Sequence, residues 1–378
     1  MKRPWRRRES RKKPPFQRFL SALIFPMIAV AAFVRPPAPA LAAQAGRGQT
    51  VMYVYDASSL GLRSGDAARL DQINYAFALI ANGEASGSHW RGIRELKSYL
   101  KQHPNVDGVL SVGGWGADGF SQACATREGR ERLADSILRL MDEHGFVGVD
   151  IDWEYPGVSF AGIASSKDDE ENWYALLSLL RAGLDKKELG TGRHYTLSVA
   201  LSVSQASTVD AARLNRVLDQ VVLMAYDLYG FTTQTGHQAG LYPAGGVSES
   251  GAYGVNALVK GGMARSKILL GIPAYGRMWR QVTGENGYGV KAGTTGDKLL
   301  NYADVQALEN SGYAHYYDDA AQAAWWYNGA NFVSAEDEQS LRYKARWALK
   351  QGLLGAAVWA YSHDSDGSVT RILSEEFR

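Results

Sequence analysis

The amino-acid sequence predicts an α/β fold, and within that class a (β/α)8 TIM barrel. Eight apolar or alternating runs of strand length follow one another along the 378-residue chain, and segments with helical spacing lie between many of them. Intervening helices are typical of parallel strands, and eight parallel strands close into a barrel. A doubly wound open sheet is the alternative, but YVYDASSLG, which overlaps the end of the first run, is not a Gly-rich phosphate loop.

The expected strands are apolar or alternating in pattern, with many β-branched and aromatic residues. They are VMYVYDA (51–57), INYAFALI (73–80), VDGVLSVGG (106–114), VGVDIDWEY (147–155), YTLSVALS (195–202), QVVLMAYDLY (220–229), KILLGIPAY (267–275) and LLGAAVWAYS (353–362).

Three segments between these runs predict helices most clearly. The segment 128–145 has apolar residues three and four apart and ends at Gly145, a plausible C-cap. The segments 168–190 and 335–352 begin with acidic residues and end with basic ones, which matches the helix dipole.

The spacing of the runs predicts an insertion between the seventh strand and the last helix. The seventh run begins at position 267 and the eighth at 353, a separation of 86 residues that exceeds one helix. Residues 280–333 are rich in Gly, Tyr and Trp, and we expect them to form a small α+β subdomain on the face where barrel loops expand. The barrel domain itself is expected to span 44–378.

The first 43 residues read as an export signal. A basic segment precedes an apolar run from Phe19 to Val34, and the small residues PAPALAAQA follow, with a cleavage pattern at Ala40–Ala42. An uncleaved anchor is the alternative, but the apolar run is shorter than the roughly 20 residues that span a bilayer. We therefore expect cleavage near Ala42, a secreted protein and no stable membrane association afterwards.

The basic charge of the chain belongs to this N-terminal segment. Ten of the 41 Lys and Arg residues and one of the 39 acidic residues lie in 1–43, so the remainder carries 31 basic and 38 acidic residues, a net charge of −7. A nucleic-acid partner is not expected, because phosphate binding needs a basic face on the folded part. The lone cysteine, Cys124, excludes an intrachain disulfide and is expected to be buried and structural.

The fourth run carries the most informative residues. Asp150, Asp152 and Glu154 alternate with Val149, Ile151 and Trp153, so on a strand the three acids share one face. In a barrel that face points into the lumen, where close carboxylates repel and at least one tends to hold a proton. Glu154 lies nearest the carboxyl end of the strand, where barrel active sites form, and is the expected general acid.

Two other interpretations of these acids were weighed. An edge strand with a wet acidic face would show the same alternation, but the position of this run as the fourth of eight argues against it. A Mg²⁺ or Ca²⁺ site would also use carboxylates. The other runs show no matching acids near their carboxyl ends beyond Asp227, so we expect neither a metal nor a cofactor.

The segment FVGVDIDWEYPG (146–157) resembles the D-G-x-D-x-D-x-E signature of glycoside hydrolase family 18, the chitinase family. Four further motifs of that family are resembled in the same order along the chain. They are VLSVGGW (109–115), LMAYDLYG (223–230), LLGIPAYGRMW (269–279) and GAAVWAY (355–361). The resemblance covers nearly the whole chain after the export signal.

The resemblance implies a retaining mechanism in which the substrate's own acetamido group attacks the anomeric carbon. Glu154 would protonate the leaving oxygen and then activate water, Asp152 would orient the acetamido group, and Asp150 would share a proton or hydrogen bond with Asp152. Tyr226 would hydrogen-bond the acetamido oxygen. These four residues are the expected catalytic set.

A second set of residues is expected to contact or position the substrate. Asp227 would contact the distorted sugar and Trp359 would form the apolar floor beneath it; Tyr53 and Ser111 would support Asp150. Arg277 either lines the cleft or anchors the inserted subdomain, whereas Trp325 and Trp326 are expected in the core of that subdomain. The set is completed by Phe77, by Tyr275 as a cleft residue, and by Trp115 and Trp279 as platforms for outer sugars.

The chain departs from the family signature at one position, where Val147 stands in place of the first Asp. Because the missing acid precedes Asp150 on the same run, we expect a modest change in the pH profile and retained activity.

Three functions remain compatible with the sequence. The first is a secreted chitinase that acts on chitin or N-acetylglucosamine oligosaccharides as a monomer. The second is a hydrolase of the same family, such as an endo-β-N-acetylglucosaminidase or an enzyme that trims cell-wall glycans. The third is a non-catalytic chitin-binding barrel, which could dispense with the acid that this chain keeps at Glu154.

Overall fold

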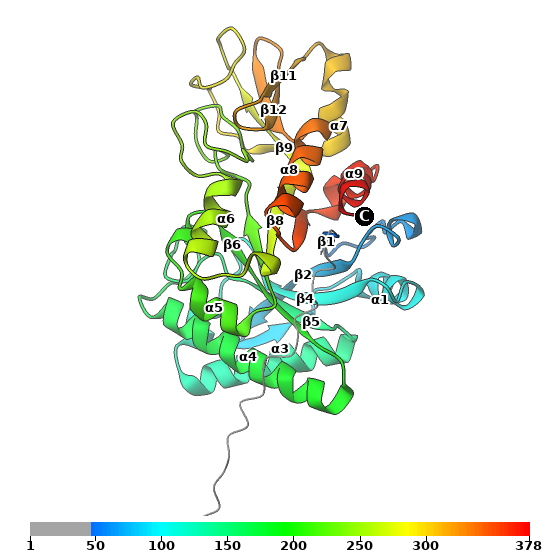
Figure 1. Ribbon diagram of the computed structural model, residues 1–378. Helices are drawn as coiled ribbons and strands as arrows, with labels where there is room; N and C mark the ends of the chain where they lie inside the picture. Colours follow the sequence, from blue (N-terminus) through cyan, green and yellow to red (C-terminus); the bar gives the residue numbers. More distant parts are fainter. Residues whose placement is uncertain (1–46) are drawn as a thin grey trace, which may run out of the picture. The chain divides into compact units, whose positions relative to one another are not determined.

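The structure of the protein is a computed structural model that describes residues 47–378. The expected signal peptide (1–43), its cleavage site near Ala42 and the start of the barrel domain at 44 therefore lie outside the described residues. Figure 1 shows the described part as strands surrounded by helices, with a second group of strands formed by residues between about 275 and 335.

Eight parallel strands form a closed barrel. Each of the eight expected runs overlaps one of them, so the predicted fold class is confirmed. The strands are β1 (Gln49–Tyr55), β2 (Gln72–Ala81), β4 (Asp107–Gly113), β5 (Gly148–Asp152), β6 (Thr196–Ser202), β7 (Gln220–Met224), β8 (Ile268–Pro273) and β14 (Gly355–Trp359). Their order is β1-β14-β8-β7-β6-β5-β4-β2, and pairing of β1 with β2 closes the barrel. β3 (Glu84–Ser86) extends β2 as an antiparallel hairpin.

Several strands end earlier than their sequence runs suggest, and two of these ends change the placement of expected site residues. β5 stops at Asp152 and β7 stops at Met224, so the residues that follow lie in loops at the carboxyl ends of the strands. Glu154, Tyr226 and Asp227 therefore belong to loops, which corrects the expectation that Glu154 shares a strand face with Asp150 and Asp152.

Helices cover the outside of the barrel. They are α1 (Ile93–Gln102), α2 (Phe120–Cys124), α3 (Arg127–His144), α4 (Asp169–Thr191), α5 (Ala211–Val217), α6 (Gly251–Lys260), α8 (Glu338–Lys350) and α9 (Ser368–Phe377). Short 3-10 turns lie at Ser64–Asp66, Gln205–Ser207, Arg265–Lys267, Ala307–Ser311 and Tyr361–His363. The Thr126 side chain caps α3, and Gly145 ends it at a φ of +77°, as its sequence predicts.

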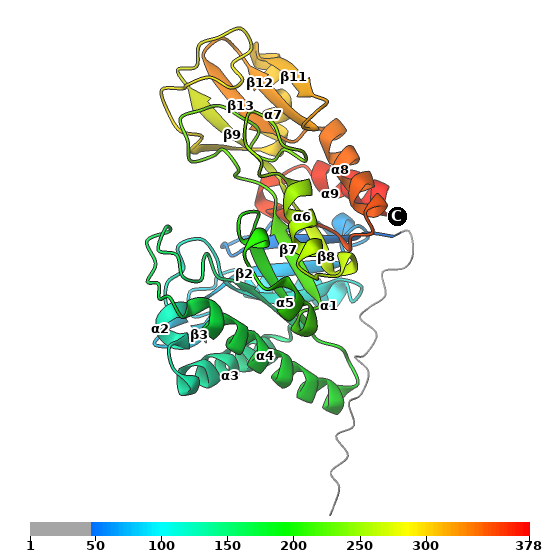
Figure 2. The ribbon, with the colours of Figure 1, turned by 60° about the vertical axis from the view of Figure 1, so that its left-hand side comes forward.

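A second, antiparallel sheet follows β8. It consists of β9 (Tyr275–Arg280), β10 (Lys298–Asn301), β11 (Ala314–Asp318), β12 (Ala323–Tyr327) and β13 (Asn331–Ala335), in the order β10-β9-β13-β12-β11. Figure 2 shows these strands as one layer, with α7 (Tyr302–Gln306) beside them. We call residues 275–335 the inserted sheet; they begin five residues before and end two residues after the expected 280–333.

Alternation along β12 places its two tryptophans on opposite faces of the inserted sheet. Trp325 packs with Trp279 and Phe332, whereas Trp326 packs with Met278 and Val333. Both Trp325 and Trp326 therefore lie in the core of the insertion, as expected. Trp279 is fully buried there as well, and its indole nitrogen donates to the Thr232 carbonyl.

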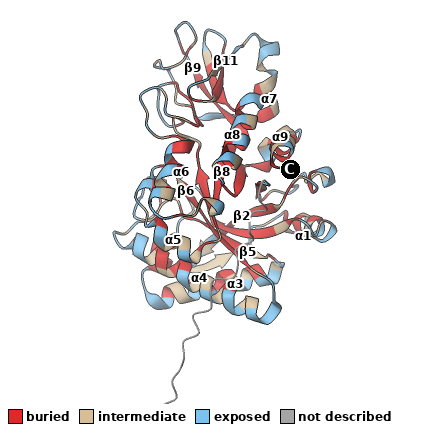
Figure 3. Ribbon diagram, viewed as in Figure 1, coloured by how far each residue is buried: buried red, intermediate tan, exposed pale blue. Residues whose placement is uncertain are grey.

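The buried residues of the barrel form two layers. One fills the lumen, with Val51, Ala76, Val222 and Leu269 among its members, and the other lies between the strands and the helices. Figure 3 shows the strands buried and the outer faces of the helices exposed. Cys124 is fully buried, and its burial raises the pKa of the thiol to about 12, which fits the structural role expected for it. Among residues 47–378, no helix combines the length and the apolarity needed to cross a bilayer.

Candidate active site

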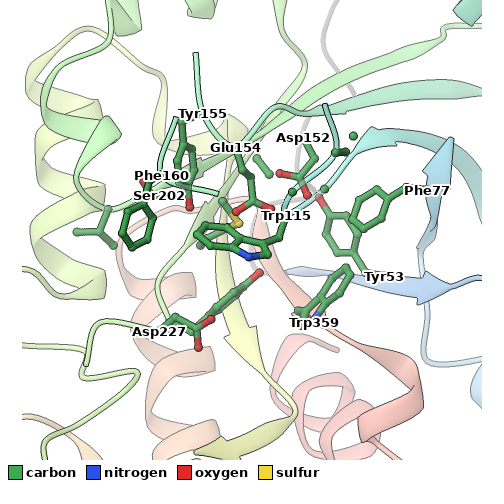
Figure 4. A pocket seen from close by; sticks show the side chains of 18 of the residues that line it. Tyr53, Phe77, Trp115, Asp152, Glu154, Tyr155, Phe160, Ser202, Asp227 and Trp359 are labelled. Atoms are coloured by element: carbon green, nitrogen blue, oxygen red, sulfur yellow. The ribbon is translucent and has the colours of Figure 1, made fainter. Parts of the chain in front are cut away.

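A cavity of about 930 Å³ opens at the carboxyl ends of the barrel strands. Its lining comes from β1, β2, β6, the first residue of β9, the carboxyl ends of β4, β5, β7 and β14, and the loops that follow β4, β5, β6 and β7. Figure 4 shows Asp152 and Glu154 on one side of the Trp115 indole and Trp359 and Asp227 on the other. Volumes of this order are typical of sites that bind small ligands or sugar units.

Asp150 lies at the base of this cavity and is held by three hydroxyl groups. Tyr53 Oη and Ser111 Oγ donate to Oδ2 at 3.0 and 2.7 Å, and Ser198 Oγ donates to Oδ1 at 2.7 Å. Burial raises the pKa of Asp150, and the hydroxyl hydrogen bonds oppose that rise because they favour the carboxylate. Asp150 is thus fixed from β1, β4 and β6 and does not itself line the cavity.

Asp152 ends β5 and lines the cavity, and hydrogen bonds do little to compensate for the burial of its carboxyl group. Its residue is 4% exposed, and its Oδ1 has no hydrogen-bond partner among the described residues. Burial raises the pKa of Asp152 well above its usual range, and the nearby Glu154 and Asp150 carboxyls raise it further. A buried carboxylate oxygen without a partner is costly, so this atom is suited to accept a hydrogen bond from a ligand.

Glu154 follows two residues after the strand and lines the same cavity. Burial raises the pKa of its carboxyl group to about 7, with the Tyr155 hydroxyl acting in the opposite direction and Asp227 adding to the rise. At neutral pH a substantial fraction of this group carries a proton. It can therefore act as a general acid and, after losing the proton, as a general base.

Asp227 is held in a fixed ion pair. It adopts a φ of +62°, and its carboxylate accepts from Arg277 Nε at 2.5 Å and Nη2 at 2.6 Å and from Tyr275 Oη at 2.6 Å. Arg277 also donates to the Gly296 carbonyl and does not line the cavity. Arg277 therefore ties the inserted sheet to the loop after β7, which is the second of the two roles expected for it. Tyr226, Asp227 and Tyr275 line the cavity.

The floor of the cavity is aromatic. Trp359 stacks on Phe77 at 5.6 Å between ring centroids and lies 5.7 Å from the ring of Tyr53. These rings come from β14, β1 and β2, and β1 pairs with each of the other two strands. A flat apolar surface of this kind suits the face of a sugar ring.

Three further rings meet across the mouth of the cavity, and we call them the aromatic cluster. Trp115 stacks on Phe231 at 5.6 Å and contacts Phe160 edge-on at 5.7 Å; Phe160 and Phe231 lie 6.1 Å apart. Their exposed fractions are 49% for Trp115, 68% for Phe160 and 54% for Phe231. The cluster joins loops that follow β4, β5 and β7, and of its members the sequence pointed only to Trp115.

Nine of the expected site residues line the cavity, namely Tyr53, Phe77, Trp115, Asp152, Glu154, Tyr226, Asp227, Tyr275 and Trp359. Asp150, Ser111 and Arg277 stand behind them and contact lining residues or the carboxylate at the base. Trp279 is the exception, because it is buried in the inserted sheet; this corrects the expectation that it stacks on an outer sugar.

Sequence reasoning missed Ser198, Tyr155, Phe160, Phe231 and Glu249. Ser198 had a signal, since it lies on the sixth run and its register partner in β5 is Asp150. The other four lie on loops whose course the sequence pattern does not specify. No cluster of three or more His, Cys, Asp or Glu suited to a metal ion occurs within residues 47–378.

Val147 precedes β5 at the end of the barrel opposite Glu154. Its backbone pairs with Gly108 and Thr196, and alternation directs its side chain to the face opposite that of Asp150. An acid at this position would therefore not point toward Asp150 in the lumen.

Comparison with known proteins gives one consistent result. The family described as glycosyl hydrolases family 18 matches residues 49–364. Chitinase A1 of Niallia circulans is 30% identical over 309 residues, which are 75% of this chain and 44% of that protein. The class V chitinase of Arabidopsis thaliana is 29% identical over 289 residues, or 73% of this chain and 74% of that protein. The chain thus spans less than half the length of Chitinase A1.

Solved structures resemble most of the chain. A family 18 N-acetylglucosaminidase from Paenibacillus barengoltzii is 34% identical with a TM-score of 0.82, covering 87% of this chain and 99% of that one. A class V chitinase from Nicotiana tobaccum, solved in complex with NAG4, is 27% identical with a TM-score of 0.77, covering 88% and 99%.

Proposed function

The chain belongs to glycosyl hydrolases family 18, and we propose from this membership that it is a secreted chitinase that cleaves β-1,4 bonds between N-acetylglucosamine units with retention. The observation that carries the proposal is the buried, unpartnered Asp152 Oδ1 in the same cavity as Glu154. An acetamido N–H is the group of this substrate that such an oxygen would accept.

The relatives support the substrate class. Both curated relatives named above are chitinases, and the Nicotiana tobaccum structure holds an N-acetylglucosamine tetramer. Secretion rests on the export signal expected in residues 1–43.

The first step breaks the glycosidic bond. The acetamido carbonyl oxygen of the bound sugar attacks the anomeric carbon, while Glu154 gives its proton to the departing glycosidic oxygen. The positive charge moves onto the acetamido group, which becomes a cyclic oxazolinium ion. Asp152 accepts the N–H of that ion and stabilises its charge, and the Tyr226 hydroxyl donates to the acetamido oxygen before it attacks.

The second step restores the enzyme. Glu154, now a carboxylate, takes a proton from water, and the resulting hydroxide attacks the anomeric carbon from the side that the leaving group vacated. The oxazolinium ring opens to the acetamide, so the product keeps the β configuration. Two inversions at one carbon give net retention, and Glu154 ends protonated as it began.

The remaining residues position these groups. Tyr53, Ser111 and Ser198 hold Asp150 below Asp152, so that the negative charge beneath the acetamido group is fixed in place. Trp359 would carry the apolar face of the reacting sugar. Asp227, held by Arg277, would accept a hydrogen bond from a sugar hydroxyl.

An exo-acting N-acetylglucosaminidase is the second candidate, and one observation favours it. The family 18 N-acetylglucosaminidase from Paenibacillus barengoltzii is 34% identical and matches over nearly its whole length. The same catalytic groups would serve both activities, and the two differ only in how many sugars remain on each side of the cleaved bond. The endo-β-N-acetylglucosaminidase and the binding protein remain as further outcomes of the experiment.

The test is time-resolved product analysis on N-acetylglucosamine tetramers and hexamers, with the anomeric configuration of fresh products read by NMR. We expect β products from the wild type and a loss of at least about a hundredfold in turnover for Glu154→Gln, because a general acid contributes 10² to 10⁴. A chitinase releases oligomers and an exo enzyme releases monomers only. Unchanged turnover in Glu154→Gln, or α products, would refute the mechanism, and cleavage of N-glycans alone would assign the alternative.

A further inference from the structure

The charges that line the cavity are all of one sign. Its lining contains five carboxylates and, among the described lining residues, no Lys, Arg or His. The five are Asp118, Asp152, Glu154, Asp227 and Glu249. A cleft with this lining attracts cations and repels anions more strongly than the net charge of the chain suggests.

Three of the five carboxylates are accounted for by the proposed chemistry. Asp227 is neutralised by Arg277 through two short hydrogen bonds. Burial raises the pKa values of Asp152 and Glu154, so these two groups together retain protons. Neither the ion pair nor the catalytic pair offers a free negative charge to an outer sugar.

Asp118 and Glu249 are different because the reaction does not use them. Asp118 is exposed and accepts from the Ala164 backbone N–H at 3.0 Å and from Gln122, and these hydrogen bonds lower its pKa. Glu249 is half-buried and lies directly before Ser250, whose side chain caps α6. Its carboxylate has no hydrogen-bond or ion-pair partner among residues 47–378. Glu249 thus presents an uncompensated carboxylate to the cavity, on the loop between β7 and α6.

The cavity also contains independent evidence of where an N-acetyl group must bind. Asp152 is 96% buried, its Oδ1 has no hydrogen-bond partner among the described residues, and it lines the cavity together with Trp359 and Tyr226. Because the acetamido oxygen is the nucleophile, a deacetylated sugar in this catalytic subsite cannot react. A free amine can be accommodated productively only in another subsite.

We propose that Glu249 makes this cleft select partially deacetylated chitin, by pairing with the ammonium group of a glucosamine unit in a subsite outside the catalytic one. The inference rests on the proposed function, since it assumes that N-acetylglucosamine occupies the catalytic subsite. Among residues that line the cavity, Glu249 is the carboxylate that neither the reaction nor an internal partner employs.

Two consequences follow from the same charge distribution. A half-buried pair between Glu249 and one ammonium group is worth a factor of about three to five in kcat/KM, the upper part of the range for partly exposed ion pairs. Glycans that carry free carboxylates on their sugars are disfavoured by the uncompensated acids.

The experiment compares kcat/KM for the fully acetylated tetramer and for tetramers with one free amine, each at low and high NaCl. Wild type, Glu249→Gln and Glu285→Gln are measured in parallel. Glu285 is exposed on the inserted sheet's first loop, does not line the cavity and provides the same change of charge. Thermal unfolding of all three proteins checks that they are equally folded.

The relevant ratio is kcat/KM for the tetramer with one free amine divided by kcat/KM for the fully acetylated tetramer. We expect this ratio to fall about three- to fivefold in Glu249→Gln and to be unchanged in Glu285→Gln. In the wild type the ratio should also fall with salt, because screening weakens the pair. Mass-spectrometric sequencing of the products should show N-acetylglucosamine at every new reducing end and glucosamine enriched at one fixed distance from it, an enrichment that Glu249→Gln removes.

Two negative results have separate meanings. If the wild type cleaves the acetylated tetramer but Glu249→Gln has the same substrate ratio and the same product pattern, the role of Glu249 is refuted and the proposed function stands. If the wild type cleaves neither tetramer, the proposed function fails and the inference fails with it.

Discussion

Asp150, Asp152 and Glu154 lie within five positions of one another, yet each has different surroundings. Asp150 accepts three hydroxyl hydrogen bonds, Asp152 faces the cavity with an unpartnered oxygen, and Glu154 lies past the strand with its pKa raised to about 7. Their roles follow from these environments, because all three share the same carboxylate chemistry. In the proposed mechanism, Asp150 positions its neighbour, Asp152 binds the acetamido group, and Glu154 transfers the proton.

The pH dependence of kcat/KM should report the pKa of Glu154 in the free enzyme. The acid form is the active one, so activity should fall as pH rises through about 7. Asp227 raises that pKa and the Tyr155 hydroxyl lowers it. We therefore expect Asp227→Asn to move the basic limb to lower pH and Tyr155→Phe to move it to higher pH, as measured with a chromogenic N-acetylglucosamine oligomer.

The position of the limb, and not the height of the profile, is the relevant quantity, since either variant could also reduce turnover. In Asp227→Asn the positive charge of Arg277 loses its partner, which adds to the shift toward lower pH. If the basic limb moved in the same direction in Asp227→Asn and in Tyr155→Phe, a group other than Glu154 would control the profile.

At the scale of single elements, β5 shows how far alternation along a strand can be used. The run 147–155 correctly predicted that Asp150 and Asp152 face the lumen. It could not show that the strand ends at Asp152, because Trp153 and Tyr155 continue the alternation. The loop after β5 then places Glu154 in the lining of the cavity, and the alternation of residues along the run does not predict the course of that loop. The same holds at β7, where Tyr226 and Asp227 follow the strand.

Val147 tests this view of β5. Its side chain lies on the face opposite Asp150, at the amino end of the strand, so a carboxylate there is remote from Glu154. We expect Val147→Asp to leave the basic limb of the pH profile in place and to lower stability only, because Val147 is half-buried. This replaces our expectation that the missing Asp alters the pH profile. A displaced limb with unchanged unfolding would show that the position communicates with the catalytic pair.

Trp115 and Trp279, which the sequence assigned the same role, should respond to substitution in different ways. Trp279 is fully buried in β9, and Trp279→Ala should lower the free energy of unfolding by about 3–5 kcal/mol through loss of packing. Trp115 is half-exposed at the cavity mouth, and Trp115→Ala should raise KM for a tetramer by about 2- to 13-fold with little change in unfolding.

Denaturant unfolding and tetramer kinetics, measured on both variants, separate the two roles. Trp325→Ala is the matched control, because Trp325 packs in the same cluster as Trp279 and does not line the cavity. It should behave like Trp279→Ala. A rise in KM for Trp279→Ala at unchanged stability would restore Trp279 as a substrate platform.

For the whole molecule, the sequence predicted the architecture better than the surface. Eight strands in the correct order could be found because buried parallel strands require long apolar runs. The inserted sheet was recognisable from its length and its aromatic residues, although its first strand, β9, was assigned to the barrel in part. The aromatic cluster and Glu249 could not be predicted, because they depend on loops from distant parts of the chain meeting at one place.

A buried ion pair lies where the inserted sheet meets the barrel. Lys344 of α8 is 3% exposed and donates to Glu336, at the end of β13, and to the Ala239 carbonyl in the loop after β7. Glu336 is 1% exposed and also accepts from Ser340 Oγ. Gln238, next to Ala239, donates to the backbone of Tyr275 and Ser334. One region thus connects α8, the inserted sheet and the loop that carries Phe231 and Glu249.

Removing one partner of this pair should cost more than removing both. Lys344→Met leaves the Glu336 carboxylate buried without its cation, with Ser340 Oγ as its remaining donor, and removes the lysine donor from the Ala239 carbonyl. We expect a loss of about 3–5 kcal/mol in the free energy of unfolding. Lys344→Met with Glu336→Gln removes the uncompensated charge and should be more stable than Lys344→Met alone. Lys350→Met, at the exposed end of the same helix, is the matched control and should unfold like the wild type. Equal denaturation midpoints for Lys344→Met and Lys350→Met would mean that apolar packing, and not this ion pair, holds the inserted sheet against the barrel.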